Sequence, residues 1–509
     1  MLDSTSIYQK FTKDVLIIGL AQLILSLRGL ILLPLIAKLL GAASYGIWVQ
    51  AVITLALIAG FCELGISFSF IRFFAGETDK EKIRHGFFSI LITSFSLACV
   101  SAVILFLFAS PVAGMLFGGR EATNVVQLCA LILPFYSINF LFLFFFRAFR
   151  KMKLYALLML AQAFGELAII AGLILAGWGI FGAVLAILIT CLLTDLVMFF
   201  IISSQVGLSL PPLESFVRIK DYVRFGAPLV LSNFSWWVAN ASDRYVIAAF
   251  LGVAFTGIYS AAYALGSIVT IFMSPLNLVL VPALAHLYDN NRLEEVKTHL
   301  SYSLKYFLLL AIPSAAGLCL LAKLILQVLA TAEFALAGPI VVPFVVAAMV
   351  LHGCYGIIYQ PLTLVKKTSI IGIAWGIAGA LNLGLNLLLV PRFGIVAAAI
   401  TTLASFAVAI GITCYASFKY LKFDIDWVFI LKSLLATGVM SGVILLFNPA
   451  GLLELVVAIV AGVLVYSIVI YLLKGISKQE ILFFRRLAVS LMPLGRSKVA
   501  ENSNRKENE

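Results

Sequence analysis

Long runs of apolar residues, separated by short polar segments, recur along the whole chain. A run of about 17–25 mostly apolar residues is long enough to cross the hydrocarbon core of a bilayer as a helix. Such runs occupy residues 15–38, 46–72, 87–110, 128–148, 154–176, 183–205, 227–251, 257–284, 303–328, 339–364, 369–390, 395–418, 427–447 and 452–473. The strands of a membrane β-barrel would instead alternate apolar and polar residues. The pattern therefore predicts an all-α polytopic membrane protein with 14 transmembrane helices.

The amino-acid composition excludes several other classes of protein. Of the 509 residues, 63% are hydrophobic and 11% are charged, whereas a typical soluble domain is about 45–50% apolar and about 25% charged. Because a soluble chain must cover its surface with polar residues, a soluble enzyme, a nucleic-acid-binding protein and a disordered scaffold are excluded. The 7 cysteines lie in apolar runs without CxxC spacing, which predicts neither disulfides nor a metal site.

The positive charges indicate how the spans are oriented. With the N-terminus placed in the cytoplasm, 28 of the 35 Lys and Arg residues lie on the cytoplasmic side, and only Arg120 and Arg392 lie on the opposite side. Cytoplasmic loops of membrane proteins are enriched in Lys and Arg. We therefore expect a multi-pass protein of the cell membrane (inner or plasma membrane) with both termini in the cytoplasm. Its basic tail is expected to contact the anionic membrane lipids of the inner leaflet.

Two short motifs are repeated at almost the same distance along the chain. The stretch LGAASYGIW at residues 40–48 recurs 211 residues later as LGVAFTGIY at residues 251–259. The stretch GIFGA at residues 179–183 recurs 215 residues later as GIVAA at residues 394–398. Both motifs fall in predicted external turns, where glycine suits a tight turn. The similar offsets predict that the chain contains two duplicated halves.

The duplication predicts two pseudo-symmetric six-helix lobes related by an axis along the membrane normal. The N-terminal lobe is expected at residues 1–206, a cytoplasmic linker at 207–226 and the C-terminal lobe at 227–418. Two accessory helices are expected at 419–474, followed by a basic cytoplasmic tail at 475–509. Two lobes around a central cavity are the usual plan of an alternating-access transporter, which is an argument from architecture.

Six ionisable residues lie deep inside predicted spans: Arg28, Glu63, Glu166, Asp195, Asp243 and Arg244. An ionised side chain near the middle of a bilayer costs about 2.5–3.5 kcal/mol on insertion scales. Arg28 and Arg244 occupy the first span of each half, so the repeat would place both at the cavity between the lobes. Two permanent cations there suit a phosphate or diphosphate. The carboxylates could pair with these arginines or carry a coupling ion, and the sequence leaves both interpretations open.

Polar residues also form a stripe along the predicted span 227–251. They recur at steps of three and four residues, as Asn233, Trp236, Asn240 and the pair Asp243 and Arg244. Tyr259 and Tyr263 continue the series on the next span. Such a stripe should face water or a polar ligand, since lipid would leave its groups without hydrogen bonds, although hydrogen bonding between helices is the alternative. The candidate substrate-binding residues are Arg28, Arg244, Asn233, Trp236, Asn240, Tyr259 and Tyr263, and the candidate ion-coupling residues are Glu63, Asp195 and Asp243.

Several missing motifs argue against catalysis. The glycine-containing turn at residues 252–260 lacks the lysine of a P-loop, so no ATPase is predicted. The predicted external loops offer only Glu121 and Glu333 as acids, too few for a glycosyltransferase or polymerase. We expect no catalytic residues and no metal or organic cofactor, with H⁺ or Na⁺ as the coupling ion. His352 lies inside a span and is expected to be a packed residue rather than a proton relay.

The motifs together resemble a known family. The residues that carry the likeness lie at 39–46, at 242–247, at 251–263 and at 394–400. Their order and spacing resemble the polysaccharide-biosynthesis flippases, the O-antigen and teichoic-acid exporter family of the multidrug/oligosaccharidyl-lipid/polysaccharide exporter superfamily. The resemblance implies a V-shaped bundle whose cavity is lined by spans 1, 2, 7 and 8. It also implies accessory helices that form a groove for a polyprenyl chain.

The leading hypothesis is a flippase for cell-surface polysaccharide precursors, such as those of lipopolysaccharide. The resemblance implies that it moves a lipid-diphosphate-linked oligosaccharide from the cytoplasmic to the outer leaflet, by alternating access. Its partners would be the lipid-linked oligosaccharide, membrane lipids and a polysaccharide polymerase or other assembly proteins, with no nucleic acid. The second hypothesis is a cation-coupled drug or metabolite antiporter of the same superfamily, which would depend on the buried carboxylates rather than on the arginines.

Overall fold

The computed structural model describes residues 4–476 together with residue 480, and the described residues form helices and no strands. The α-helices are α1 (Ser4–Cys62), α2 (Ile66–Phe74), α3 (Lys80–Leu107), α4 (Ala109–Leu116), α5 (Thr123–Ala148), α6 (Met152–Leu175), α7 (Gly179–Val206), α8 (Leu213–Val217), α9 (Ile219–Leu251), α10 (Val253–Ser267), α11 (Met273–Asp289), α12 (Leu293–Leu329), α13 (Ala332–Ala337), α14 (Val342–Ile358), α15 (Gln360–Leu364), α16 (Thr368–Tyr420), α17 (Trp427–Phe447) and α18 (Leu452–Leu472). Two short 3₁₀ helices are η1 (Arg120–Ala122) and η2 (Ile268–Phe272). Most of the predicted tail at 475–509 lies outside the described residues.

The prediction of a multi-pass helical membrane protein is confirmed. Within the described residues, 11 helices are long and apolar enough to cross a membrane. Two of them, α1 and α16, contain a glycine with non-helical backbone angles, so each consists of two helices that meet at a kink. The helix α9 is not among the 11, because its polar stripe lowers its hydropathy. The count of 14 spans and the division into two lobes stay predictions.

The repeated glycines share an unusual backbone conformation. Gly41 and Gly252, which are equivalent in the first repeat, have φ angles of 82° and 94°. Gly179 and Gly394, which are equivalent in the second repeat, have φ angles of 55° and 70°. Positive φ costs residues with a side chain roughly 1–2 kcal/mol. The two copies of each motif therefore require glycine for the same local reason, which is what a duplicated turn would need.

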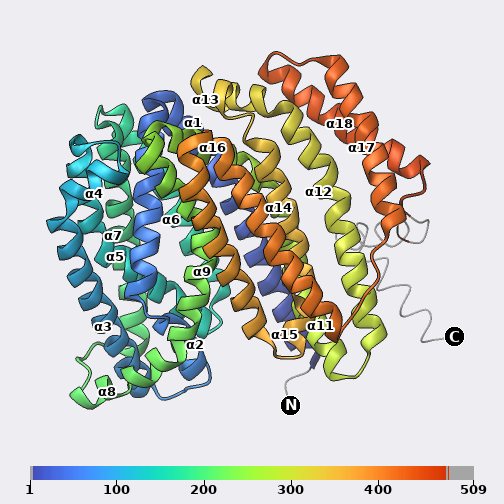
Figure 1. Cartoon of the computed structure of the whole chain (residues 1–509). Helices are drawn as coiled ribbons and strands as arrows, with labels where there is room; N and C mark the ends of the chain where they lie inside the picture. Colours follow the sequence, from blue (N-terminus) through green and yellow to red (C-terminus); the bar gives the residue numbers. More distant parts are fainter. Residues whose placement is uncertain (1–3, 477–479, 481–509) are drawn as a thin grey trace.

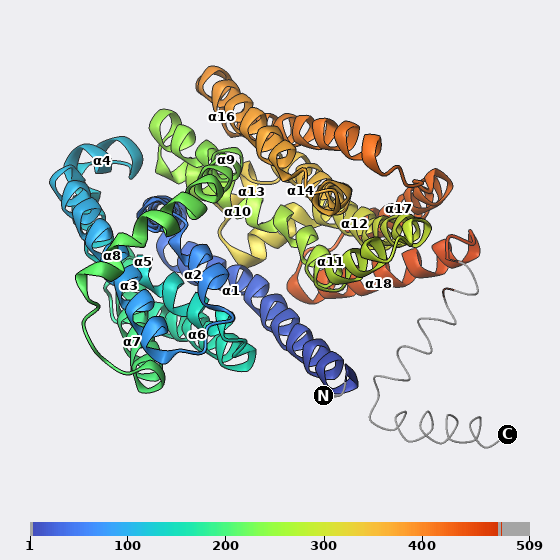
Figure 2. The ribbon, with the colours of Figure 1, turned by 90° about the horizontal axis from the view of Figure 1, so that it is seen from below.

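The helices run side by side along a common direction (Figure 1). The helices α3, α4, α5 and α7 gather on one side, whereas α12, α17 and α18 gather on the other. Between them, α1 packs against α5, α6 and α7 on one side and against α10 on the other. Seen from below, α1 crosses between the two groups of helices (Figure 2). The accessory helices α17 and α18 begin and end within one residue of the predicted runs and pack against α12.

The first repeated motif packs against its own copy. A Cβ atom added at Gly46 would lie 1.9 Å from the backbone oxygen of Val253, and one added at Gly257 would lie 2.2 Å from the backbone oxygen of Ala42. Gly46 and Gly257 are equivalent at the repeat offset of 211, and so are Ala42 and Val253. The contact is therefore reciprocal, like a two-fold interface between identical subunits. It joins α1 to α10 at the predicted external end of the bundle.

A second close approach of backbones lies between Gly65 and Gly226. Gly65 follows α1 with a φ of 70°, and a Cβ atom added there would lie 2.4 Å from the backbone oxygen of Gly226 in α9. One turn later along α2, the Ser69 hydroxyl donates a hydrogen bond of 2.7 Å to the backbone oxygen of Tyr222. The start of α9, inside the predicted linker, is thereby attached to the N-terminal helices.

Candidate translocation site

Arg244 and Asp243 form a buried ion pair in the middle of the polar stripe on α9. The side chain of Asp243 is fully buried and that of Arg244 is 9% exposed. Arg244 Nη1 donates hydrogen bonds to Asp243 Oδ1 at 2.8 Å and to the backbone oxygen of Asn240 at 2.7 Å. From α1, Gln50 Nε2 donates to the backbone oxygen of Arg244 at 3.0 Å. Asp243 is therefore paired with an arginine, which is one of the two interpretations that the sequence left open for the buried carboxylates.

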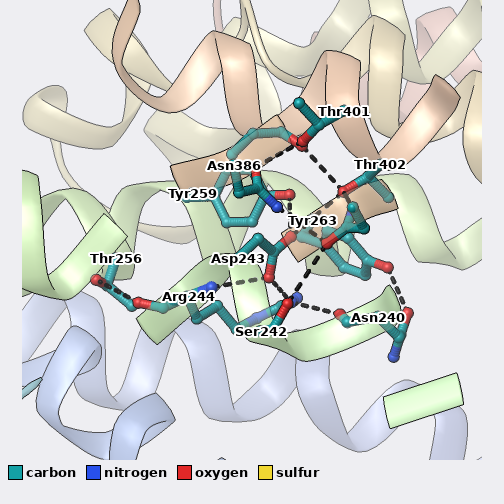
Figure 3. Close-up of polar contacts among 12 residues, drawn as sticks. Asn240, Ser242, Asp243, Arg244, Thr256, Tyr259, Tyr263, Asn386, Thr401 and Thr402 are labelled. Atoms are coloured by element: carbon teal, nitrogen blue, oxygen red, sulfur yellow. Dashed lines mark hydrogen bonds and ion pairs between the residues drawn. The ribbon is translucent and has the colours of Figure 1, made fainter. Parts of the chain in front are cut away.

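Two tyrosines of α10 enclose the ion pair (Figure 3). The Tyr259 hydroxyl donates to Asp243 Oδ2, and the Tyr263 hydroxyl donates to Asn240 Oδ1. The guanidinium carbon of Arg244 lies 4.2 Å from the ring centroid of Tyr263 and 5.6 Å from that of Tyr259. A cation over a desolvated aromatic face gains about 2 kcal/mol. Five candidate residues thus lie together in one network, in which Arg244 has almost no contact with solvent.

The network continues into α16 through residues that we did not assign from the sequence. Thr402 Oγ1 donates to Asp243 Oδ2 at 3.4 Å. Next to it, Ser242 Oγ donates to Asn382 Oδ1 at 3.5 Å, and Asn386 Nδ2 donates to the same oxygen at 2.9 Å. The spacing of Asn382 and Asn386, one helical turn apart in an apolar helix, was a usable signal. Thr402 gave none, because threonine in an apolar helix commonly bonds to its own backbone.

The first half of the polar stripe lines a separate cavity between α1 and α9. This cavity has a volume of 360 Å³, and its lining includes Glu63, Asn233, Trp236 and Trp237. Asn233 is exposed, and Trp236 is 40% exposed. The Glu63 Oε1 atom is buried and accepts no hydrogen bond within the described part of the chain. The stripe is therefore split: Asn233 and Trp236 face open space with Glu63, whereas Asn240, Asp243 and Arg244 are enclosed.

Arg28 lies in α1 and pairs with Glu166 of α6. Arg28 Nη2 donates to Glu166 Oε1, and the two side chains are 29% and 10% exposed, respectively. The Arg28 Nε atom is buried and has no partner within the described residues. Buried N–H groups are almost always paired, so the Nε donor sets Arg28 apart from Arg244, whose contacts use its guanidinium internally. Arg28 is thus the more accessible of the two predicted arginines.

Asp195 occupies a third position, on α7. Asn139 Nδ2 donates to Asp195 Oδ1 at 2.6 Å, and Gln162 Nε2 donates to Asn139 Oδ1 at 3.2 Å. Asp195 also lines a cavity of 390 Å³ with apolar side chains of α3, α5 and α7. The three candidate coupling carboxylates therefore lie in three separate environments, and only Asp243 is paired with an arginine.

A large apolar cavity lies among α12, α17 and α18. Its volume is 480 Å³, and its lining includes Pro313, Gly317, Met440, Gly462 and Tyr466. The lining is almost entirely apolar and two glycines leave room between the helices, as suits a flexible hydrocarbon chain rather than a polar solute.

His352 of α14 is packed among the aromatic rings of Tyr355, Trp375 and Phe406, with ring centroids 5.7–6.2 Å from its own.

The fold and the buried charges together define a class, a multi-pass helical membrane protein with ion pairs inside its bundle. The chain has an 18% identical structural relative described as the lipid II flippase MurJ in an inward closed conformation, with a TM-score of 0.74 over 88% of this chain and 97% of that one. An inward-facing multidrug resistance MATE transporter of the MOP superfamily is 15% identical, with a TM-score of 0.64 over 78% of this chain and 94% of that one. These likenesses show the shared fold.

The sequence comparison specifies the family. The family model described as polysaccharide biosynthesis protein matches residues 11–288, more than half of the chain, so the chain belongs to that family. The probable low-salt glycan biosynthesis flippase Agl15 of Haloferax volcanii is 26% identical over 285 residues, covering 55% of this chain and 59% of that protein. The succinoglycan biosynthesis transport protein ExoT of Rhizobium meliloti is 25% identical over 313 residues, covering 60% of each. The matches span about three fifths of these relatives.

These findings confirm the resemblance to the polysaccharide-biosynthesis flippases, and the relatives are named as flippases or transport proteins rather than enzymes. The cytoplasmic location of both termini, the lobe boundaries and the roles of the candidate site residues stay predictions.

Proposed function

We propose that this protein is a flippase that moves a lipid-diphosphate-linked oligosaccharide from the cytoplasmic to the outer leaflet of the cell membrane by alternating access. The family membership and the flippase names of the relatives support the proposal. The single observation that carries it within the chain is Arg28, a partly accessible cation in a membrane span with a buried unpaired donor. A phosphate oxygen would supply the missing acceptor, and arginine binds phosphate in a well-defined geometry.

Each part of such a substrate has a matching region in the chain. The diphosphate would bind Arg28, and the sugars would contact Asn233 and Trp236 in the cavity between α1 and α9. The polyprenyl chain would occupy the apolar cavity among α12, α17 and α18. Arg244, Asn240, Tyr259 and Tyr263 would reach the headgroup only after their network has opened, because the present arrangement uses their polar groups internally.

Alternating access requires the two halves to separate at one end at a time. The reciprocal contact of Gly46 and Gly257, in which the two backbones approach directly, would hold the predicted external end closed. Coupling to H⁺ or Na⁺ would use one of the carboxylates Glu63, Asp195 or Asp243. A polysaccharide polymerase or other assembly proteins would receive the flipped product on the outer side.

The proposal is tested in proteoliposomes with an undecaprenyl-diphosphate-linked oligosaccharide and a measurement of its exposure on each leaflet. Arg28→Ala removes at least one charge-assisted hydrogen bond, worth about 1.5–3 kcal/mol, so flipping should fall by at least about 10-fold. Arg392→Ala, outside the predicted site, is the matched control and should flip at the rate of the unmodified protein. Unchanged flipping in the double variant Arg28→Ala/Arg244→Ala would overturn the site assignment.

A cation-coupled drug or metabolite antiporter is the second candidate. The specific observation in its favour is the set of buried carboxylates in three separate environments, together with a fold shared with a multidrug transporter. It predicts efflux of toxic organic cations that is lost in Glu63→Gln, Asp195→Asn or Asp243→Asn and retained in Arg28→Ala. Efflux assays on cells that express these variants separate the two functions, because the flippase requires Arg28.

A further inference from the structure

Glu166 is a buried carboxylate to which the proposed function gives no role. It lies on α6, only 7% of its surface is exposed, and its Oε1 atom accepts a hydrogen bond from Arg28 Nη2. The pair carries no net charge, and the Arg28 side chain retains access to solvent whereas the carboxylate does not. The cation that is to bind the substrate is thus already engaged by an anion.

The neighbouring helices give Glu166 no second cation within the described residues. From α1 it is paired with Arg28. It lies within electrostatic reach of Tyr136 of α5 and of Cys191 of α7, and the carboxylate of Asp195 on α7 also reaches Cys191. On its own helix, Gln162 is one turn away and donates to Asn139 instead. Glu63, in the turn that follows α1, also lies within electrostatic reach of Tyr136, and it adds a carboxylate rather than a cation.

A diphosphate that binds here meets an unfavourable charge balance. A diphosphate esterified at both ends carries two negative charges, and Arg28 alone would have to balance these as well as the charge of Glu166. Anions in a low-dielectric site repel one another strongly, and a buried carboxylate without its own cation is costly. Such a group takes up a proton rather than remain charged. Neutral Glu166 would leave the whole charge of Arg28 to the phosphates.

We propose that Glu166 takes up one proton when the diphosphate of the substrate binds Arg28 and releases it when the diphosphate leaves. The inference rests on the proposed function, since it concerns the same arginine. The proton comes from water on the open side of the site and converts the carboxylate to a carboxyl group. Arg28 Nη2 is then free to join Nε in binding phosphate oxygens. Glu166 acts through Arg28 and is therefore a positioning residue whose protonation sets the affinity of the site.

The linkage between proton uptake and ligand binding is measured with undecaprenyl-diphospho-N-acetylglucosamine as the probe. The probe is bound to the purified full-length protein in detergent. Both phosphates of this probe are esterified, so its own charge is constant around neutral pH. The unmodified protein should take up about one proton per bound probe, as reported by an indicator dye in weakly buffered solution. Its affinity should rise about tenfold for each unit by which the pH falls, because one proton is bound with each ligand.

Glu166→Gln has the same shape and no charge, so it should bind the probe tightly at every pH and take up no proton. Glu63→Gln removes the carboxylate that follows α1 and should keep the pH dependence of the unmodified protein. Glu454→Gln, an exposed carboxylate of α18, is the control for the loss of a negative charge. Glu166→Asp retains a titrating carboxylate and should keep the pH dependence of binding. This variant and the proton uptake of the unmodified protein test the inference even if Glu166→Gln does not fold.

The outcomes distinguish this inference from the function on which it rests. If the unmodified protein binds the probe through Arg28 without proton uptake, or if Glu166→Gln keeps the pH dependence, the role of Glu166 is wrong and the proposed function stands. If Glu63→Gln abolishes the linkage instead, the proton belongs to Glu63 and the assignment to Glu166 is overturned. If the probe does not bind, or binds equally well to Arg28→Gln, the proposed function fails and this inference with it.

Discussion

Arg28 and Arg244 are predicted to occupy the first span of each lobe and yet lie in different surroundings. Arg244 is enclosed by Asp243, the Asn240 backbone and two tyrosine rings, with 9% of its side chain exposed. Arg28 has one partner, Glu166, an unpaired Nε donor and a side chain that is 29% exposed. A permanent cation is therefore enclosed in the predicted C-terminal lobe and partly exposed in the predicted N-terminal lobe.

The difference follows from the residues next to each arginine. Asp243 precedes Arg244 in the same helix, and the tyrosines of α10 are spaced four residues apart, so both rings reach the same face. Arg28 has no acidic neighbour in its own helix, and the carboxylate that it contacts comes from α6, 138 residues further on. A local pair is formed wherever the helix forms, whereas a distant pair depends on the packing of two helices.

The largest expected effect is the difference in stability between two variants, each of which removes the carboxylate of one ion pair. Asp243→Ala would leave a buried arginine without its anion, which typically costs 3–5 kcal/mol, about the range expected here. Glu166→Ala should cost less than half as much, since Arg28 can turn toward water. Chemical denaturation in detergent, followed by tryptophan fluorescence, measures both. Equal costs would show that the two arginines are equally buried in solution.

An intermediate effect concerns the close contact between α1 and α10, which lies near the Arg244 network. Gly46→Ala would place a methyl group 1.9 Å from the Val253 oxygen, one turn from Gln50, whose side chain bonds to the Arg244 backbone. We expect a destabilisation of about 1–3 kcal/mol and loss of the closed external end, seen as faster alkylation of cysteines introduced at that end of the bundle.

Gly172→Ala is the matched control for this variant. Nothing lies within 4 Å of a Cβ atom at Gly172 in α6, so the change should be neutral or slightly stabilising. If Gly46→Ala behaves like this control, the repeated motifs do not hold the two halves together.

The smallest expected effect lies within the Arg244 network. Tyr263→Phe removes the hydroxyl that donates to Asn240 and keeps the ring 4.2 Å from the guanidinium carbon, so the free energy of unfolding should fall by about 1 kcal/mol. Tyr263→Leu also removes the ring and should cost about 1–2 kcal/mol more. Identical unfolding curves for the two variants would show that the ring contributes nothing to holding Arg244.

Much of the fold could be predicted because it depends on local patterns. Apolar runs of sufficient length must form helices in a membrane, since only internal hydrogen bonding satisfies the backbone there. The accessory helices α17 and α18 agree with the predicted runs to within one residue. The repeated glycines indicated their turns correctly, because positive φ is a requirement of a single residue. The grouping of Asn240, Asp243 and Arg244 with Tyr259 and Tyr263 also followed from helical spacing.

The site was only partly predictable, because its contacts join helices that are distant in the sequence. The polar stripe of α9 does not face one cavity: Asn233 and Trp236 lie open beside Glu63, whereas the rest is enclosed by α10 and α16. The pairing of Arg28 with Glu166 requires α1 to pack against α6, which no spacing along the chain reveals.

The sequence by itself determined that this protein is a bundle of membrane helices with an internal repeat and a few deeply placed charges. It did so because the length and hydropathy of each apolar run, and the glycine in each turn, are properties of a single segment of the chain. The tertiary structure alone decided which of those charges are satisfied. A buried ion pair exists only where two side chains meet with the right geometry, and that meeting is set by the packing of whole helices. For this reason two arginines that the sequence placed alike, each in the first span of a predicted lobe, differ in the structure: Arg244 is enclosed, and Arg28 is a partly accessible candidate for binding phosphate.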